Sequence, residues 1–231
     1  MNYSDEEFNR LLEGLVENLL NANHHFRLYT KLEEALADYE QEINQCRGFW
    51  GLTISAHREV GILNLCRAYD GNKQSLSLER FLEVISENIE LFSTSKFRDR
   101  LKDNPRLDSL SKYDRVPNFD ELDEEKKSVS NKDPLVKKLT ILRSNIVAHT
   151  NEGWLLNKKQ DLIPLTFEDV KELIDRGFRI FNKYRSLFEA STNASSLIGE
   201  DDYKTVLKYY RIGSKSVRFF HDIEFDLNYR K

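Results

Sequence analysis

The sequence contains few cysteines, prolines and glycines, and it contains no long apolar run. Its 231 residues include 2 cysteines, 4 prolines and 9 glycines. Cys46 and Cys66 lack the spacing of a disulfide framework, so both are expected to be reduced and buried in a cytoplasmic protein. No stretch of about 18 apolar residues predicts a membrane helix, and the acidic start is unlike a signal peptide. The scarcity of proline and glycine favours long helices joined by few breaks.

Several common catalytic signatures are also missing. The sequence has no GxGxxG, GxxxxGK, HExxH, CxxC or GxSxG motif, which removes support for most enzyme classes. The histidines lack spacings that would gather metal ligands on one helix face, so we expect no metal and no cofactor. The net charge is −4, so any nucleic-acid site must be a local concentration of lysine and arginine.

The composition is nevertheless that of a folded protein. Hydrophobic residues make up 39% of the chain, with 14 phenylalanines and 10 tyrosines, which is too much core material for a disordered chain. The length allows one large helical domain or two small ones. We predict an all-α helical bundle that forms a single domain over residues 1–231.

Capping residues mark the starts of the predicted helices. Ser4 with Glu7 forms a capping box before a helix that begins near Asp5. Ser77 opens an amphipathic helix that reaches about residue 93, and Asp133 with the following proline opens a helix that continues to about residue 146. A further capping box, Thr166 with Asp169, begins a long apolar-faced helix.

Other segments are predicted as breaks or connectors. The apolar repeat from 23 to 46 allows one long helix, or two with a bend near 21–25. A central helix after Gly51 is expected to close at Gly71 with a left-handed cap. Residues 103–132 are predicted to be a polar insert with at most short helices, and 120–127 a solvated connector. A loop at 151–164 and a flexible linker at 191–199 complete the pattern.

The last part of the chain predicts a long helix with a basic ridge. Lys204, Lys208, Arg211, Lys215 and Arg218 follow one another at helical spacing. Such a ridge could follow an RNA backbone, although a solvated helix face is the commoner explanation. Beside it runs an apolar stripe made of Tyr203, Val206, Tyr210, Val217 and Phe220.

The segment from 142 to 150, LRSNIVAHT, carries the residues best suited to chemistry. Histidine titrates near neutrality and can act as base or acid, which suits His149. Arg143 presents a planar, permanently charged fork that matches phosphate oxygens.

The same segment resembles the R-x(4–6)-H motif of the HEPN superfamily, a group of helical-bundle proteins that includes many metal-independent endoribonucleases. A second segment, 54–85, resembles the abortive-infection U-type (AbiU-like) HEPN family. In that family a helix that ends in an aromatic–Asp pair precedes a short turn and a Ser-Leu-rich helix start. The corresponding residues are Tyr69, Asp70, Ser75 and Ser77. The resemblance extends over about residues 50–190.

The resemblance implies a function. It predicts a metal-independent endoribonuclease of antiphage or toxin type, with RNA as substrate and a possible antitoxin or regulatory protein as partner. HEPN nucleases often carry Asn, Asp or His directly after the motif arginine, whereas this chain has Ser144 there and Asn145 next. The expected catalytic residues are therefore Arg143, His149, Asn145 and Ser144. Substrate contacts are expected from Asp70, Lys158 and Lys159, and from the ridge Lys204, Lys208, Arg211, Lys215 and Arg218.

Geometry limits how Arg143 and His149 can cooperate. Six residues along an uninterrupted helix correspond to a rise of about 9 Å and a rotation of about 240°, so the two side chains would not converge. Either the helix ends near Val147 and His149 turns back, or two chains place these helix ends face to face. The resemblance implies the second arrangement, a site built across a homodimer.

Two alternatives need no catalysis. Arg143 could complement the helix dipole while His149 caps the last carbonyl groups. The protein would then be a non-catalytic module that binds RNA or a nucleotide, or that regulates a partner. A dimeric scaffold without RNA, with Arg143 held in a structural salt bridge, is a third possibility.

Overall fold

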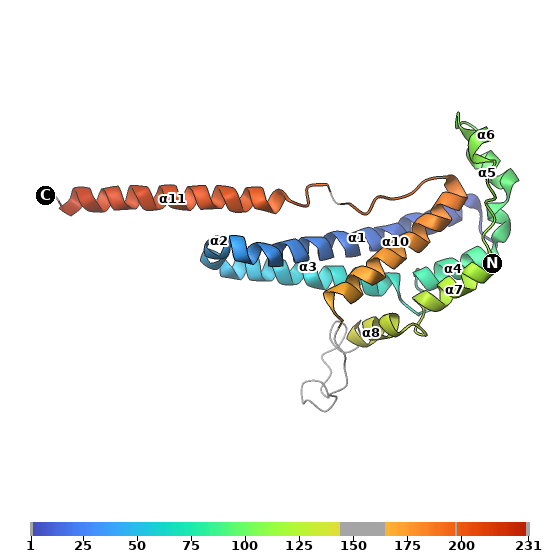
Figure 1. The fold of residues 1–231 in the computed structure, drawn as a ribbon, viewed down its shortest axis with the longest axis horizontal. Coiled ribbons are helices and arrows are strands. Elements are labelled where there is room, and N and C mark those ends of the chain that lie inside the picture. Colours follow the sequence, from blue (N-terminus) through green and yellow to red (C-terminus); the bar gives the residue numbers. More distant parts are fainter. Residues whose placement is uncertain (1, 144–164, 197, 230–231) are drawn as a thin grey trace, which may run out of the picture. The chain divides into compact units, whose positions relative to one another are not determined.

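The computed structural model describes residues 2–143, 165–196 and 198–229, with side chains up to residue 216 in the last stretch. Within these ranges every regular element is a helix (Figure 1), which confirms the all-α prediction. The chain forms two compact units, 1–23 with 59–195 (unit 1) and 24–58 with 196–231 (unit 2). Two helices, α1 (Asp5–Asp38) and α3 (Arg47–Ala68), contribute to both units. That the whole chain is one domain stays a prediction.

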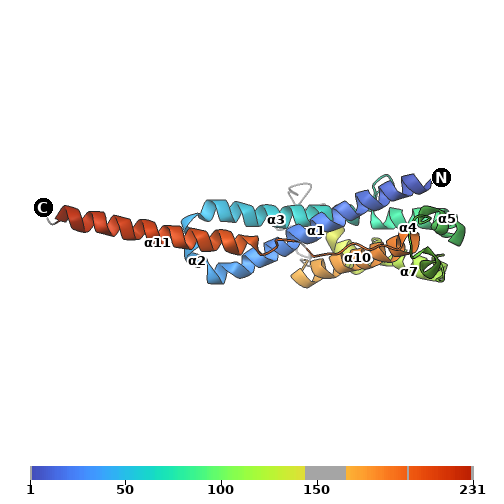
Figure 2. The ribbon, with the colours of Figure 1, turned by 90° about the horizontal axis from the view of Figure 1, so that it is seen from above.

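Unit 1 combines the start of α1 and the end of α3 with the helices that follow. These are α4 (Leu78–Glu87), the 3₁₀ helix η1 (Ile89–Phe92), α5 (Thr94–Arg100), α6 (Leu107–Leu110), α7 (Phe119–Val129), α8 (Pro134–Leu142) and α10 (Phe167–Glu189). In both views α4 and α7 lie side by side, and α10 contacts η1, α5 and α8 (Figures 1 and 2).

The core of unit 1 is built from aromatic rings supplied by several helices. Phe8 on α1 is fully buried, and its ring lies 4.7 Å from that of Phe188 and 5.6 Å from that of Phe92. Phe81 on α4 stacks on Phe8 at 5.8 Å and contacts Tyr184 on α10. Because these side chains come from α1, α4, η1 and α10, their burial joins distant parts of the sequence.

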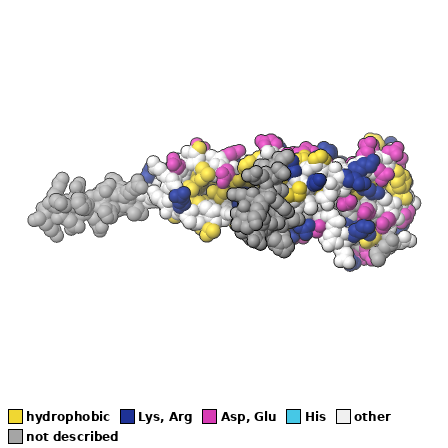
Figure 3. All heavy atoms as spheres, turned by 90° about the horizontal axis from the view of Figure 1, so that it is seen from below, with side chains coloured by type: hydrophobic (Ala, Val, Ile, Leu, Met, Phe, Trp, Pro, Cys, Tyr) yellow, Lys and Arg dark blue, Asp and Glu magenta, His cyan; other side chains and the backbone are white. Residues whose placement is uncertain are grey.

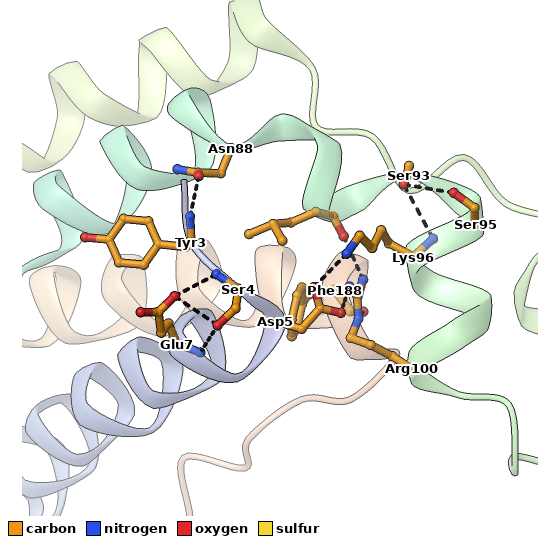
Figure 4. A network of polar contacts seen from close by, with 11 residues as sticks. Tyr3, Ser4, Asp5, Glu7, Asn88, Ser93, Ser95, Lys96, Arg100 and Phe188 are labelled. Carbon is orange, nitrogen blue, oxygen red and sulfur yellow. Dashed lines mark hydrogen bonds and ion pairs between the residues drawn. The ribbon is translucent and has the colours of Figure 1, made fainter. Parts of the chain in front are cut away.

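The predicted helix starts are confirmed. Ser4 and Glu7 form the reciprocal capping box of α1, with the Ser4 N–H donating to Glu7 Oε2 at 2.8 Å (Figure 4). The same figure shows the Tyr3 N–H donating to Asn88 Oδ1, which attaches the chain start to the end of α4. Ser77, Asp133 and Thr166 cap α4, α8 and α10 as expected.

The polar insert is more ordered than a solvated connector. Asn118 caps α7 through its side chain, and the acidic-then-basic run lies on this helix. Leu122 and Val129 on the inner side of α7 are buried, where they pack toward α4. The charged residues lie on the outer face. α7 is therefore an amphipathic helix, which the high charge content of this segment did not indicate.

Three helix ends differ from the sequence prediction. α1 passes 21–25 without a break, which is one of the two alternatives, but it ends at Asp38 and not near 46. α4 ends at Glu87 and not near 93, and the 3₁₀ helix η1 follows it. α3 already includes Gly48 and Gly51, and it ends at Ala68 without a left-handed glycine at Gly71. The turn after α3 is instead made by Asp70, whose side chain accepts the Asn72 N–H at 3.1 Å.

Unit 2 contains the second half of α1, α2 (Glu40–Gln45), the first half of α3 and α11 (Asp202–Tyr229). The long C-terminal helix is thus confirmed. Leu207 of α11 is fully buried against Leu32, Ile43 and Trp50. Of the predicted apolar stripe, Tyr203 packs against this core, but Val206 is 56% exposed and Leu207 is the buried residue instead.

A close contact at Gly177 predicts a cost for any larger residue. An added Cβ there would lie 2.7 Å from Cδ2 of Leu19, a side chain that is itself fully buried. We expect Gly177→Ala to lower the free energy of unfolding by about 1–3 kcal/mol, because overpacking exceeds the gain in helix propensity. Gly48→Ala is the control, since a Cβ there meets nothing within 4 Å. Urea unfolding compares the two variants, and equal midpoints would contradict the prediction.

Candidate functional site

Helix α8 carries Arg143 at its C-terminal end. Asp133 caps the helix by accepting the N–H groups of Leu135 at 2.9 Å and Val136 at 3.1 Å. Buried Val136 and Leu139 fix the inner face of α8. The helix therefore has a defined start and a defined face, and these place Arg143 at the end of its last turn.

The turn after α3 presents Asp70 to α8. Asp70 Oδ1 accepts the backbone N–H of Asn72, and Oδ2 accepts the Ser75 hydroxyl at 3.0 Å. Tyr69 anchors the same turn, because its buried hydroxyl donates to the Leu173 carbonyl of α10 at 2.6 Å. Contacts within its own turn therefore fix the Asp70 carboxylate independently of any partner on another helix.

Arg143 and Asp70 form an ion pair, with Nη1 2.7 Å from Oδ1. Burial alone would raise the pKa of Asp70, but hydrogen bonds from Arg143, from the Asn72 backbone and from Ser75 lower that pKa below its ordinary value. The hydrogen bond to Asp70 raises the pKa of Arg143. Both groups are therefore charged over the physiological pH range.

A pocket of about 170 Å³ opens beside this ion pair. Cys66, Tyr69 and Leu139 form its apolar wall, and Asn131 and Arg143 supply polar groups. The Thr140 hydroxyl donates to Asn131 Oδ1 at 2.7 Å, which fixes how the Asn131 amide is presented. The pocket thus offers a guanidinium and an amide beside a small apolar surface.

Arg143 differs from the structural arginines of unit 1. Arg100, Arg115 and Arg176 each donate to at least one backbone carbonyl, and the guanidinium groups of Arg100 and Arg115 lie over phenylalanine rings. Among the described residues, Asp70 is the one ion-pair partner of Arg143, whose side chain remains 41% exposed. Within the part of the chain that the structure describes, this ion pair engages the Nη1 atom of the guanidinium.

The pocket wall itself is chemically inert. Burial raises the pKa of the Cys66 thiol to about 12, so the thiolate is absent near neutrality. Burial likewise raises the pKa of Tyr69. Both cysteines are free thiols, as expected, but Cys46 is only half-buried because it lies in the turn between α2 and α3.

The other predicted catalytic residues lie outside the described residues. These are Ser144, Asn145 and His149, together with the substrate candidates Lys158 and Lys159. Among the predicted site residues that the structure describes, Arg143 and Asp70 lie together as an ion pair. Their relation to His149 stays a prediction.

The basic ridge belongs to unit 2, and part of it is already engaged there. Arg211 donates to Glu42 at 2.6 Å and to the Asp38 carbonyl, and it lies over the Tyr39 ring. Lys204 pairs with Asp201 at 2.9 Å. Lys208 and Lys215 are exposed, and the side chain of Arg218 lies outside the described residues. On the face in Figure 3, acidic and basic side chains are intermingled over the described part.

The sequence did not reveal Asn131, Thr140 or Cys66 as neighbours of the site. One of them carries a retrospective signal, because Thr140 precedes Arg143 by three residues at the end of α8. Such spacings place side chains on one helix face. Asn131 carries no such signal, since it lies in the turn between α7 and α8.

Comparison with known families agrees with this architecture. The HEPN-type family model described as AbiU2 matches residues 5–209. The chain is therefore a helical HEPN protein. Within that class it belongs to the AbiU2 family, as the two sequence segments predicted. No match was found among curated proteins or solved structures. None of the described helices is long and apolar enough to cross a membrane.

Proposed function

We propose that the protein is a metal-independent endoribonuclease of antiphage or toxin type. One observation carries the proposal: Asp70 holds Arg143 at the rim of a pocket while the arginine side chain remains 41% exposed. A guanidinium so placed can bind phosphate oxygens and stabilise the charge that develops during cleavage. Membership of the AbiU2 family supports a role of this kind.

The reaction needs only proton transfer and charge stabilisation. The 2′-hydroxyl loses its proton to a base and bonds to phosphorus, while the bond from phosphorus to the 5′-oxygen breaks and that oxygen takes up a proton. The products are a 2′,3′-cyclic phosphate and a 5′-hydroxyl end. We assign proton transfer to His149 and stabilisation of the phosphate to Arg143. Ser144 and Asn145 assist as polar groups, and a homodimer supplies two copies of each residue.

One observation favours the alternative, a non-catalytic HEPN module. Asp70 already neutralises Arg143, so the pair presents less positive charge than a free arginine. A module of this type would bind RNA or a nucleotide in the same pocket, or regulate a partner protein, without breaking a bond. The two proposed functions therefore differ in whether the protein cleaves RNA.

The test is cleavage of a pool of labelled, structured RNAs in EDTA. We expect wild-type protein to cut and to leave cyclic-phosphate ends, and we expect His149→Ala to lose about 100-fold or more of the rate. His221→Ala, at another histidine, is the matched control and should cut normally. Light scattering checks that all three proteins have the same mass. RNA binding without any cleavage would exclude the nuclease and leave the binding module.

A further inference from the structure

Unit 2 contains a groove of about 370 Å³ that is lined by the second half of α1, by α2 and by the first half of α3. Its volume falls within the usual range for small-ligand sites. Tyr29, Leu36 and Ile54 give it an apolar surface, and Arg47 and Arg58 give it positive charge. Glu33 is the one carboxylate among the described lining residues, so the lining carries a net positive charge.

The two arginines lie on one face of α3. They are eleven residues apart, which is about three helical turns or about 16 Å along the axis. The other described arginines of unit 2, Arg27 and Arg211, pair with Glu200 and Glu42. No ion pair engages Arg47 or Arg58 among the described residues, and both side chains are exposed. Their charge is available to a ligand.

A glycine between the two arginines borders open space in the groove. Gly51 lies inside α3 and lines the groove, and a Cβ there would meet nothing within 4 Å. Glycine inside a helix is less favourable than alanine, and here the packing of unit 2 does not require it. Its absent side chain leaves space that a ligand can approach closely.

We propose that this groove binds a short stretch of single-stranded RNA. Two non-adjacent phosphates would contact Arg47 and Arg58, because guanidinium forks match phosphate oxygens. A base would stack on Tyr29, since tyrosine rings bind bases without sequence preference. That the strand is RNA rests on the proposed function. An acidic peptide would use the same charges but would leave the apolar surface of Tyr29 and Ile54 without a matching ring.

The test measures binding of a labelled, unstructured oligoribonucleotide by fluorescence anisotropy in EDTA. All proteins carry His149→Ala, so that cleavage cannot obscure binding. Gly51→Leu should fill the groove and weaken binding about tenfold or more, while improving helix propensity and so preserving stability. Gly48→Leu places the same side chain on the same helix outside the groove lining, and we expect unchanged affinity.

The arginines are tested by salt dependence. The double variant Arg47→Ala/Arg58→Ala should weaken binding, and each lost phosphate contact should reduce the slope of log K against log salt by roughly 0.7. Arg67→Ala, further along α3, is the matched control. Normal binding by Gly51→Leu would overturn the proposal. It would also be overturned if a glutamate-rich peptide, or AMP alone, displaced RNA as effectively as unlabelled oligoribonucleotide.

These results separate the groove from the nuclease. If wild-type protein never cuts RNA but binds it through Gly51 and the two arginines, the proposed nuclease fails and the groove stands. If wild-type protein cuts RNA while Gly51→Leu binds and cuts like wild type, the groove fails and the nuclease stands. Where both are correct, Gly51→Leu raises KM and leaves the rate at saturating RNA unchanged.

Discussion

Replacing Arg143 with alanine is expected to reduce the rate of RNA cleavage by about 100- to 1,000-fold. Loss of one preorganised donor to a developing negative charge has an effect of that size in other enzymes. The fold should survive, because Arg143 lies after the last residue of α8 and is 41% exposed. Initial rates on labelled RNA measure the effect, and circular dichroism with thermal unfolding tests the fold. Arg67→Ala is the control, and a cutting rate near wild type for Arg143→Ala would exclude its proposed role.

Asp70 is expected to act as a positioning residue for Arg143. Asp70→Asn keeps the shape but weakens the hold on the guanidinium, so kcat should fall by more than KM changes. The pKa of Asp70 is lowered in the folded chain, so its contribution to stability is present above the ordinary aspartate value of about 3.9 and is lost as the pH falls through the lowered value. A loss of activity near pH 6 therefore has another source, and it should persist in Asp70→Asn.

The second large effect is expected at Phe8. Its ring is fully buried and contacts the rings of Phe81, Phe92 and Phe188. Truncating a buried phenylalanine to alanine costs about 3–5 kcal/mol, a large share of the roughly 5–15 kcal/mol that stabilises a typical domain. Phe8→Ala should therefore be close to unfolding at 37 °C, as measured by urea titration.

A matched control is available on α7. Phe119 begins that helix and is 56% exposed, so Phe119→Ala removes the same atoms from a largely solvated position. Its free energy of unfolding should change by less than about 1 kcal/mol. Equal losses in Phe8→Ala and Phe119→Ala would show that the aromatic cluster does not stabilise unit 1 as its burial indicates.

Local signals explain which helices could be predicted from the sequence. A cap is formed by residues two or three positions apart, so Ser4, Asp133 and Thr166 reveal helix starts without knowledge of the fold. The end of α3 could not be inferred in this way. Glycine is the usual residue of a left-handed cap, so Gly71 suggested one. The chain turns instead through the hydrogen bond from the Asn72 N–H to the Asp70 carboxylate, and Gly71 does not adopt a left-handed conformation.

Packing against a distant segment decided the features that were missed. α7 looks like a solvated connector until α4 covers Leu122 and Val129. On α11 the buried residue is Leu207 and not the expected Val206, because Leu32 and Trp50 pack around Leu207. Arg211 was expected to face RNA, yet Glu42 and Tyr39, about 170 positions earlier, bind it. These partners are too far away in sequence to be recognised by spacing.

The candidate site likewise has a part that the sequence predicted and a part that depends on packing between distant segments. Arg143 and Asp70 were identified from the resemblance to a family, and the structure adds that they touch. The pocket beside them depends on Asn131, Cys66 and Leu139, which come from three different segments. Only the folded chain assembles that surface.

The attachment of α8 makes the candidate site sensitive to ionic strength. Its start is joined to α10 by Asp133–Arg176, a pair with side chains only 10–20% exposed, whereas its end is joined to the turn after α3 by the more exposed Arg143–Asp70 pair. Dissolved ions screen exposed charges more strongly than buried ones. Rising salt should therefore loosen the guanidinium while the helix stays anchored, so that the ionic strength of the surroundings sets how firmly Arg143 is held without unfolding the protein.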